Sequence, residues 1–119
     1  MTKVWASEFS DSEGCYDNDL DDGDYYYAEL STNPGAEKKE LNYKALGGLD
    51  KYHKLRISYK GESVIAYKGD KGRGGIDDGK LRRIDLHKKL AKRLGFSGLD
   101  YVKIEEVSDA SDDDDDNDD

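Results

Sequence analysis

The sequence predicts one small, mainly β domain with a single late helix, followed by an acidic tail. Apolar and polar residues alternate over residues 54–68, the pattern of strands that bury one face. Apolar residues recur at helical spacing over residues 85–94. The 119 residues give room for one domain, and 34% hydrophobic residues allow only a modest core. A large active-site cavity is therefore not expected.

The strands are predicted from β-branched and aromatic residues bounded by turn residues. An acidic loop over residues 10–24 separates the first two strands, and a long glycine-rich loop is expected over 69–80 because it holds five glycines. The predicted strands are Lys3–Phe9, Asp24–Leu30, the two arms of a hairpin within Lys54–Lys68, and Tyr101–Val107.

One helix is predicted, over Asp85–Leu94. Asp85 is a residue type that caps the free amides of a first helical turn. Leu86 and Leu90 share one side with Leu94, and Gly95 suits the left-handed conformation of a helix C-cap.

Charge is segregated along the chain. Residues 1–24 carry a net charge of −7 and residues 108–119 one of −8, whereas residues 25–107 have 18 basic against 12 acidic residues and a net charge of +6. The acidic ends can serve solubility or fold back on the basic body. Alternatively, the basic body meets a polyanion, and an anionic cell-wall polymer is favoured over nucleic acid because the chain lacks a basic motif interleaved with aromatics. The tail from 108 is expected to be disordered.

The chain is expected to fold by packing alone, without a cofactor. Cys15 is the only cysteine, so neither an intrachain disulfide nor a cysteine-based zinc site can form. No apolar run reaches the length of a membrane span, and the first residues lack the order of a secretory signal. We expect a protein that is cytoplasmic at synthesis, or one that leaves by a route the sequence does not show.

Three stretches in order resemble a known family. They are VIAYKGDKGRGG at 64–75, RRIDLHKKLAKRLGF at 82–96 and GLDYVKIEEV at 98–107. They are similar to the double-psi β-barrel of rare lipoprotein A and the expansins: a strand with a key aspartate, a glycine-rich loop, an IDLS-like helix start and a closing strand. Residues 14–16 and 26–30 resemble the first two barrel segments more loosely.

The resemblance implies a six-stranded barrel with a cleft for cell-wall glycan. Asp70 falls on the family aspartate, which supports lytic cleavage of peptidoglycan in rare lipoprotein A relatives together with a histidine. Tyr43 stands where that histidine is expected, and Arg73 replaces the proline that closes the aspartate turn. Tyr26 matches the family's aromatic position and is expected to be exposed in the cleft.

Glycoside cleavage needs an acid and either a second carboxylate or attack by a substrate hydroxyl. Asp70 can be that acid if burial raises its pKa, and Asp77 and Asp78 are the nearest second carboxylates in sequence. The structural alternative is that Asp70 accepts amide hydrogen bonds within its own turn. The expected glycan-binding residues are Tyr26, Tyr43, Lys71, Arg73 and Asp77.

Two other kinds of site are set aside. Asp17–Asp24 does not fit an EF-hand, because counting from Asp17 puts Gly23 at the seventh position and Ala28 at the twelfth. A looser cation site there remains an alternative to a solvated loop, and no metal site is assigned. The glycine-rich loop has neither of the spacings typical of phosphate-binding loops.

Two functions follow from these patterns. The first is a barrel that binds or remodels peptidoglycan, with lytic activity centred on Asp70. The second is a non-catalytic structural or interaction module of a larger assembly, such as a virion, which binds a protein partner. An open groove around Asp70 favours the first function, and a loop that fills the groove favours the second.

Overall fold

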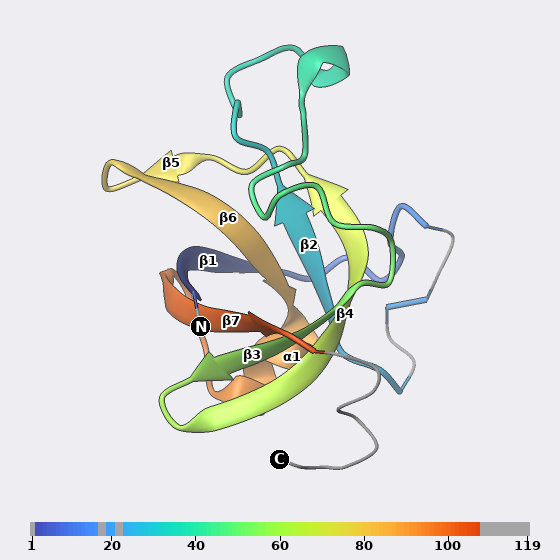
Figure 1. The fold of residues 1–119 in the computed structure, drawn as a ribbon, viewed down its shortest axis with the longest axis vertical. Coiled ribbons are helices and arrows are strands. Elements are labelled where there is room, and N and C mark those ends of the chain that lie inside the picture. The colour runs from blue at the N-terminus through green and yellow to red at the C-terminus, as the bar shows by residue number, and fades with distance from the viewer. Residues whose placement is uncertain (1, 17–18, 21–22, 108–119) are drawn as a thin grey trace.

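Six strands close into a mixed β-barrel in the computed structural model, which describes residues 2–16, 19–20 and 23–107 (Figure 1). Around the barrel the order is β1, β7, β3, β4, β2 and β6, and β6 pairs with β1 to close it. The β1–β6 and β2–β4 pairs are parallel and the other four are antiparallel. The strands are β1 (Thr2–Phe9), β2 (Tyr26–Leu30), β3 (Lys54–Tyr59), β4 (Glu62–Gly72), β6 (Lys80–His87) and β7 (Asp100–Glu106).

The predicted strands and hairpin are confirmed. The β3–β4 turn consists of Lys60 and Gly61, with φ values of 46° and 86°. Positive φ at both positions matches a two-residue turn whose twist fits that of the strands. The predicted disordered tail at 108–119 lies outside the described residues, as does part of the acidic loop.

The glycine-rich segment is not the long loop that was predicted. Strand β4 continues to Gly72, and β5 (Ile76–Asp77) forms a short hairpin with β6. Asp78 and Gly79, with φ values of 54° and 72°, make its two-residue turn. Only residues 73–75, between β4 and β5, are irregular. Gly74 and Gly75 lie in this stretch, whereas Gly69 lies inside β4, Gly72 ends that strand and Gly79 lies in the β5–β6 turn.

The predicted helix start is also wrong. The helix α1 spans Lys88–Leu94, three residues later than expected, and residues 85–87 continue strand β6. The cap is His87, whose Nδ1 accepts a hydrogen bond of 3.4 Å from the amide of Lys89. Gly95, with φ of 73°, ends the helix as predicted. Pairing of β6 with both β1 and β2 overrides the local helix signal.

The barrel interior is filled by the inward side chains of every strand, and α1 adds Leu90, Ala91 and Leu94 to the same core. The segment between β2 and β3, which contains the short 3-10 helix η1 (Lys38–Glu40), projects from the end of the barrel away from α1 (Figure 1). The strand residues of the core include Ala6, Tyr27, Leu55, Ile57, Ala66, Ile84, Leu86 and Val102.

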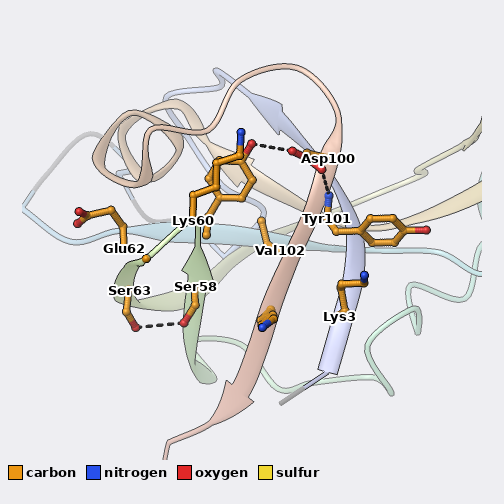
Figure 2. A pocket seen from close by; sticks show the side chains of 11 residues that line it. Lys3, Ser58, Lys60, Glu62, Ser63, Asp100, Tyr101 and Val102 are labelled. Carbon is orange, nitrogen blue, oxygen red and sulfur yellow. Dashed lines mark hydrogen bonds between the residues drawn. The ribbon is translucent and has the colours of Figure 1, made fainter.

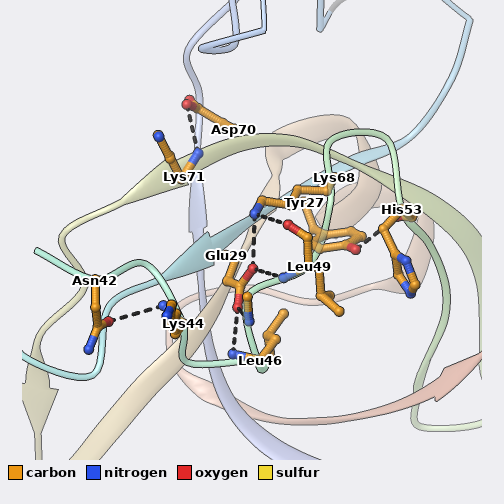
Figure 3. Close-up of polar contacts among 11 residues, drawn as sticks. Tyr27, Glu29, Asn42, Lys44, Leu46, Leu49, His53, Lys68, Asp70 and Lys71 are labelled. Atoms are coloured by element: carbon orange, nitrogen blue, oxygen red, sulfur yellow. Dashed lines mark hydrogen bonds and ion pairs between the residues drawn. The ribbon is translucent and has the colours of Figure 1, made fainter.

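A buried ion pair fastens this segment to the barrel (Figure 3). Glu29 is fully buried, and its Oε1 lies 2.9 Å from Nζ of Lys68, which is also buried. The Glu29 carboxylate accepts amide hydrogen bonds from Leu46 (2.9 Å), Gly48 (2.7 Å) and Leu49 (2.7 Å). Lys68 donates a second bond, of 2.6 Å, to the Leu49 carbonyl. Both charges are therefore compensated, and their partners are residues that lie far from them in the sequence.

We predict that Glu29→Gln destabilises the protein by about 3 kcal/mol or more, because it leaves Lys68 buried without a counter-charge. The matched control is Glu37→Gln, which removes an exposed carboxylate 3.9 Å from Lys39. That change is expected to cost less than about 1 kcal/mol. Urea unfolding of both variants measures the difference, and equal losses would contradict the assigned role of the buried pair.

Candidate carboxylate site

One row of paired residues crosses four neighbouring strands and carries two carboxylates. Asp70 on β4 pairs with Ala28 on β2, Ala28 pairs with Asp85 on β6, and Asp85 pairs with Ser7 on β1. Paired residues project from the same face of a sheet, and two strand spacings put the Cα atoms of Asp70 and Asp85 about 10 Å apart. Ala28, which lies between the two aspartates, has a small side chain and leaves the space over it open to other groups.

This row, which we call the carboxylate row (Ser7, Asp85, Ala28, Asp70), faces outward. The residues on either side of Ala28 in β2, Tyr27 and Glu29, have buried side chains that point into the barrel, and alternation therefore turns Ala28 outward. Yet Ala28 is only 3% exposed and Ser7 only 7%. Other parts of the chain thus shield the row from solvent.

Asp85 contacts Ser7 on β1 and Arg82 on β6. Its Oδ1 accepts a hydrogen bond from Ser7 Oγ and lies 3.8 Å from Nη1 of Arg82, which in turn donates to Ser7 Oγ at 2.9 Å. Burial raises the pKa of the Asp85 carboxyl, and the negative charge of Asp70 adds to the rise, whereas Ser7 and Arg82 oppose it. A carboxyl in this setting retains its proton at higher pH than an exposed aspartate.

Arg82 connects the predicted residue Asp77 to the row. Its Nε lies 2.7 Å from Oδ2 of Asp77 on β5, although the N–H is not aimed at that oxygen as a hydrogen bond requires. The guanidinium therefore lies between two carboxylates, Asp77 and Asp85. Asp77 is an ion-pair partner of the row and not one of its members.

Asp70 anchors the acidic loop to the barrel. Among the described residues, its Oδ1 accepts the amide of Lys71 at 2.8 Å and the amide of Cys15 at 3.2 Å. The first bond is the local one that the structural alternative predicts, and the second crosses to the 10–24 loop. Burial, followed by the nearby Asp70, raises the pKa of the Cys15 thiol.

The acidic loop also fills space beside the row. Leu20 is fully buried, and a Cβ added to the neighbouring Gly69 would lie 2.7 Å from Leu20 Cδ2 and 2.8 Å from Tyr26 Cδ1. Only glycine fits at this irregular point of the β2–β4 pairing. Tyr26 is 6% exposed and packs against Tyr67, so the expectation that it is exposed in a cleft is wrong.

The remaining predicted residues separate into two groups. Lys71 Nζ lies 4.8 Å from the ring centroid of the half-buried Tyr43, so the structure brings these two predicted residues together. Arg73 instead donates from Nη1 to the carbonyls of Pro34 (2.8 Å) and Ala36 (2.6 Å). These two hydrogen bonds hold the segment after β2 and engage the Arg73 guanidinium.

Sequence reasoning missed Asp85 and Ser7 as site residues. Asp85 was interpreted as a helix cap, and a serine near the start of a chain carries no signal of its own. The clue available in the sequence was the alternation of Ile84 and Leu86 around Asp85, which fits a strand with an outward carboxylate.

Within the described residues, no group of three or more histidine, cysteine or acidic side chains could hold a metal ion. No helix in the described part is long and apolar enough to cross a membrane. Comparison with protein-family models finds no match to this chain, and comparison with curated proteins finds none either. Function must therefore be argued from the geometry of the residues.

The raised pKa of Asp85 predicts a specific dependence of stability on pH. The folded protein holds this proton more tightly than the unfolded chain, so the free energy of unfolding falls as pH rises from the ordinary value of 3.8 through the folded-state pKa. The fall amounts to about 1.4 kcal/mol for every tenfold by which the folded protein binds the proton more tightly than the unfolded chain. Asp85→Asn is expected to remove it, because the amide does not titrate. Urea unfolding at a series of pH values measures it.

Asp100→Asn is the control of opposite sign. The Tyr59 hydroxyl, and then the Tyr101 amide, lower the pKa of Asp100, so its contribution is lost as pH falls below 3.8. The prediction for Asp85 is refuted if Asp85→Asn and the wild type show parallel pH curves above that value.

Proposed function

We propose that this barrel binds peptidoglycan and cleaves it in the manner of a lytic transglycosylase, with the carboxylate row as its reactive centre. The observation that carries the proposal is the register, which sets Asp70 and Asp85 on one face with Ala28 between them. The closed mixed barrel supports the resemblance to the double-psi barrels of rare lipoprotein A and the expansins.

Asp85 suits the role of general acid. Its Oδ1 is engaged by Ser7, which leaves Oδ2 as the atom that carries the proton. A raised pKa keeps the proton on Asp85 to a higher pH than on an exposed aspartate, and the acid transfers it to the glycosidic oxygen as the bond to the sugar breaks. We therefore assign the acid role to Asp85 in place of Asp70.

Asp70 then acts as the base. It accepts the proton of a sugar hydroxyl as that oxygen attacks the anomeric carbon, so the product is an anhydro-sugar and no water is consumed. Lys71 follows Asp70 in β4 and its ammonium lies over the Tyr43 ring, so the two residues provide a cation and a flat apolar ring against which the glycan can lie. Asp77 takes part through Arg82.

The test is incubation of the purified protein with peptidoglycan, followed by sedimentation and mass spectrometry of the soluble products. We expect the protein to pellet with the polymer and to release anhydro-sugar products. Asp85→Asn and Asp70→Asn should each reduce product release by at least 100-fold, the order expected for loss of acid–base catalysis. Asp78→Asn, an exposed change of the same kind on the β5–β6 turn, should leave release unchanged.

A non-catalytic interaction module is the second candidate, favoured by the way the acidic loop covers the row. The Cys15 amide bonds Asp70, and Leu20 is fully buried beside it. Pelleting of the protein without any release of product eliminates the catalytic role of the carboxylate row and leaves a barrel that only binds glycan. Absence of both pelleting and product eliminates the glycan proposal.

A further inference from the structure

A second surface forms a hollow with a volume of about 490 Å³ (Figure 2). It lies between the β3–β4 turn, the first half of β7 and the start of β1. None of the four residues of the carboxylate row lines it. We call it the lysine hollow, and the residues used below are Lys3, Ser58, Lys60, Ser63, Tyr101 and Lys103.

The three lysines of the hollow are exposed, and the charges of Lys60 and Lys3 act on the nearby carboxylate of Asp100. Within the described part of the chain, none of them forms a salt bridge. Lys3 Nζ rests 4.7 Å from the centroid of the Tyr101 ring, and Lys60 Nζ rests 5.3 Å from that of Tyr59. Cation–π contacts at exposed sites are worth about 0.5–1 kcal/mol, so both ammonium groups can move to a stronger anionic partner.

The two carboxylates of the hollow already have partners. Glu62 Oε1 lies 2.9 Å from Arg93 Nη1 on α1. Asp100 accepts the Tyr59 hydroxyl at 2.7 Å and the Tyr101 amide at 2.8 Å (Figure 2). The charge of Glu62 is thus matched by Arg93, and three lysines face the single charge of Asp100, which leaves the hollow with a surplus of positive charge.

Hydroxyl and aromatic groups complete the lining. Ser58 and Ser63 face each other across the hairpin with their hydroxyl oxygens 3.2 Å apart. The Tyr101 ring supplies an aromatic face to the hollow. Outside the lining, this ring meets Trp5 edge to face at 4.9 Å, and Lys80 Nζ lies 4.4 Å from the centroid of that indole. Among the residues that the structure describes, the buried Trp5 Nε1 has no hydrogen-bond partner. Aromatic faces beside hydroxyls and cations match a ring that is apolar on its faces, rich in hydroxyls and negatively charged.

We propose that the lysine hollow binds the carboxylated sugars of an acidic polysaccharide. Three ammonium groups can bond carboxylates, the serine pair can exchange hydrogen bonds with ring hydroxyls, and Tyr101 offers a surface against the ring. The proposal goes beyond the reactive centre and does not depend on it, because the ligand, the surface and the residues differ.

The test is isothermal titration calorimetry of the full chain with an oligogalacturonate at 50 mM salt. The fully methyl-esterified oligomer of the same length is the neutral control, and single-stranded DNA of equal charge is the second polyanion. The triple variant Lys3→Gln, Lys60→Gln, Lys103→Gln should weaken oligogalacturonate binding at least tenfold. The matched triple variant Lys38→Gln, Lys39→Gln, Lys92→Gln, which removes three exposed charges elsewhere, should change it less than twofold.

Binding of the methyl-esterified oligomer is expected to be undetectable. The Asp85→Asn variant should bind the oligogalacturonate with the same affinity as the wild type. Equal weakening by the two triple variants would overturn the proposal in favour of diffuse attraction by net charge. The assignment to a sugar would be overturned if DNA bound as tightly as the oligogalacturonate and if the Lys3, Lys60, Lys103 triple variant lost as much affinity for DNA as for the oligogalacturonate. Absence of any binding by the wild type would also overturn it.

Discussion

The ion pair between Glu29 and Lys68 is the interaction on which the barrel end opposite α1 depends. Two charges are removed from water at large cost, and the cost is offset only because three backbone amides and a carbonyl complete their shells. The pair links β2 to β4 and draws the loop after η1 onto the barrel end. Lys68 immediately precedes the irregular pairing at Gly69, so the same bond fixes where Asp70 emerges.

Because side chains alternate along β2 and β6, their polar residues are divided between the inside and the outside of the barrel. Glu29 projects inward and serves stability, whereas Ala28 and Asp85 project outward to the carboxylate row. A shift of one residue in the pairing would exchange the two sets, placing the carboxylates of the row in the core. The reactive geometry is consequently a property of strand register more than of any single side chain.

The sequence predicted five of the six barrel strands, all except β6. The β3–β4 hairpin could be predicted because its period-two pattern is local and strong. The sequence placed the helix start too early, since Asp85 suits a helix cap as well as a strand, and only pairing with β1 and β2 decides between them. Asp77 was expected on chemical grounds, and the structure supplies its partner, Arg82. Neither the burial of Tyr26 nor the pairing of Glu29 with Lys68 carries a local signal, because both arise from residues about 40 positions away.

Strand β1 has a consequence for the order in which the protein can fold. Its two neighbours are β6 and β7, which are the last strands in the sequence. During synthesis, the first strand therefore has no native partner until nearly the whole domain has left the ribosome. Closing so long a loop is slow, and the unpaired edge of β1 is open to other chains meanwhile. The cluster of acidic residues that follows β1 gives the nascent chain a repulsive charge during that interval.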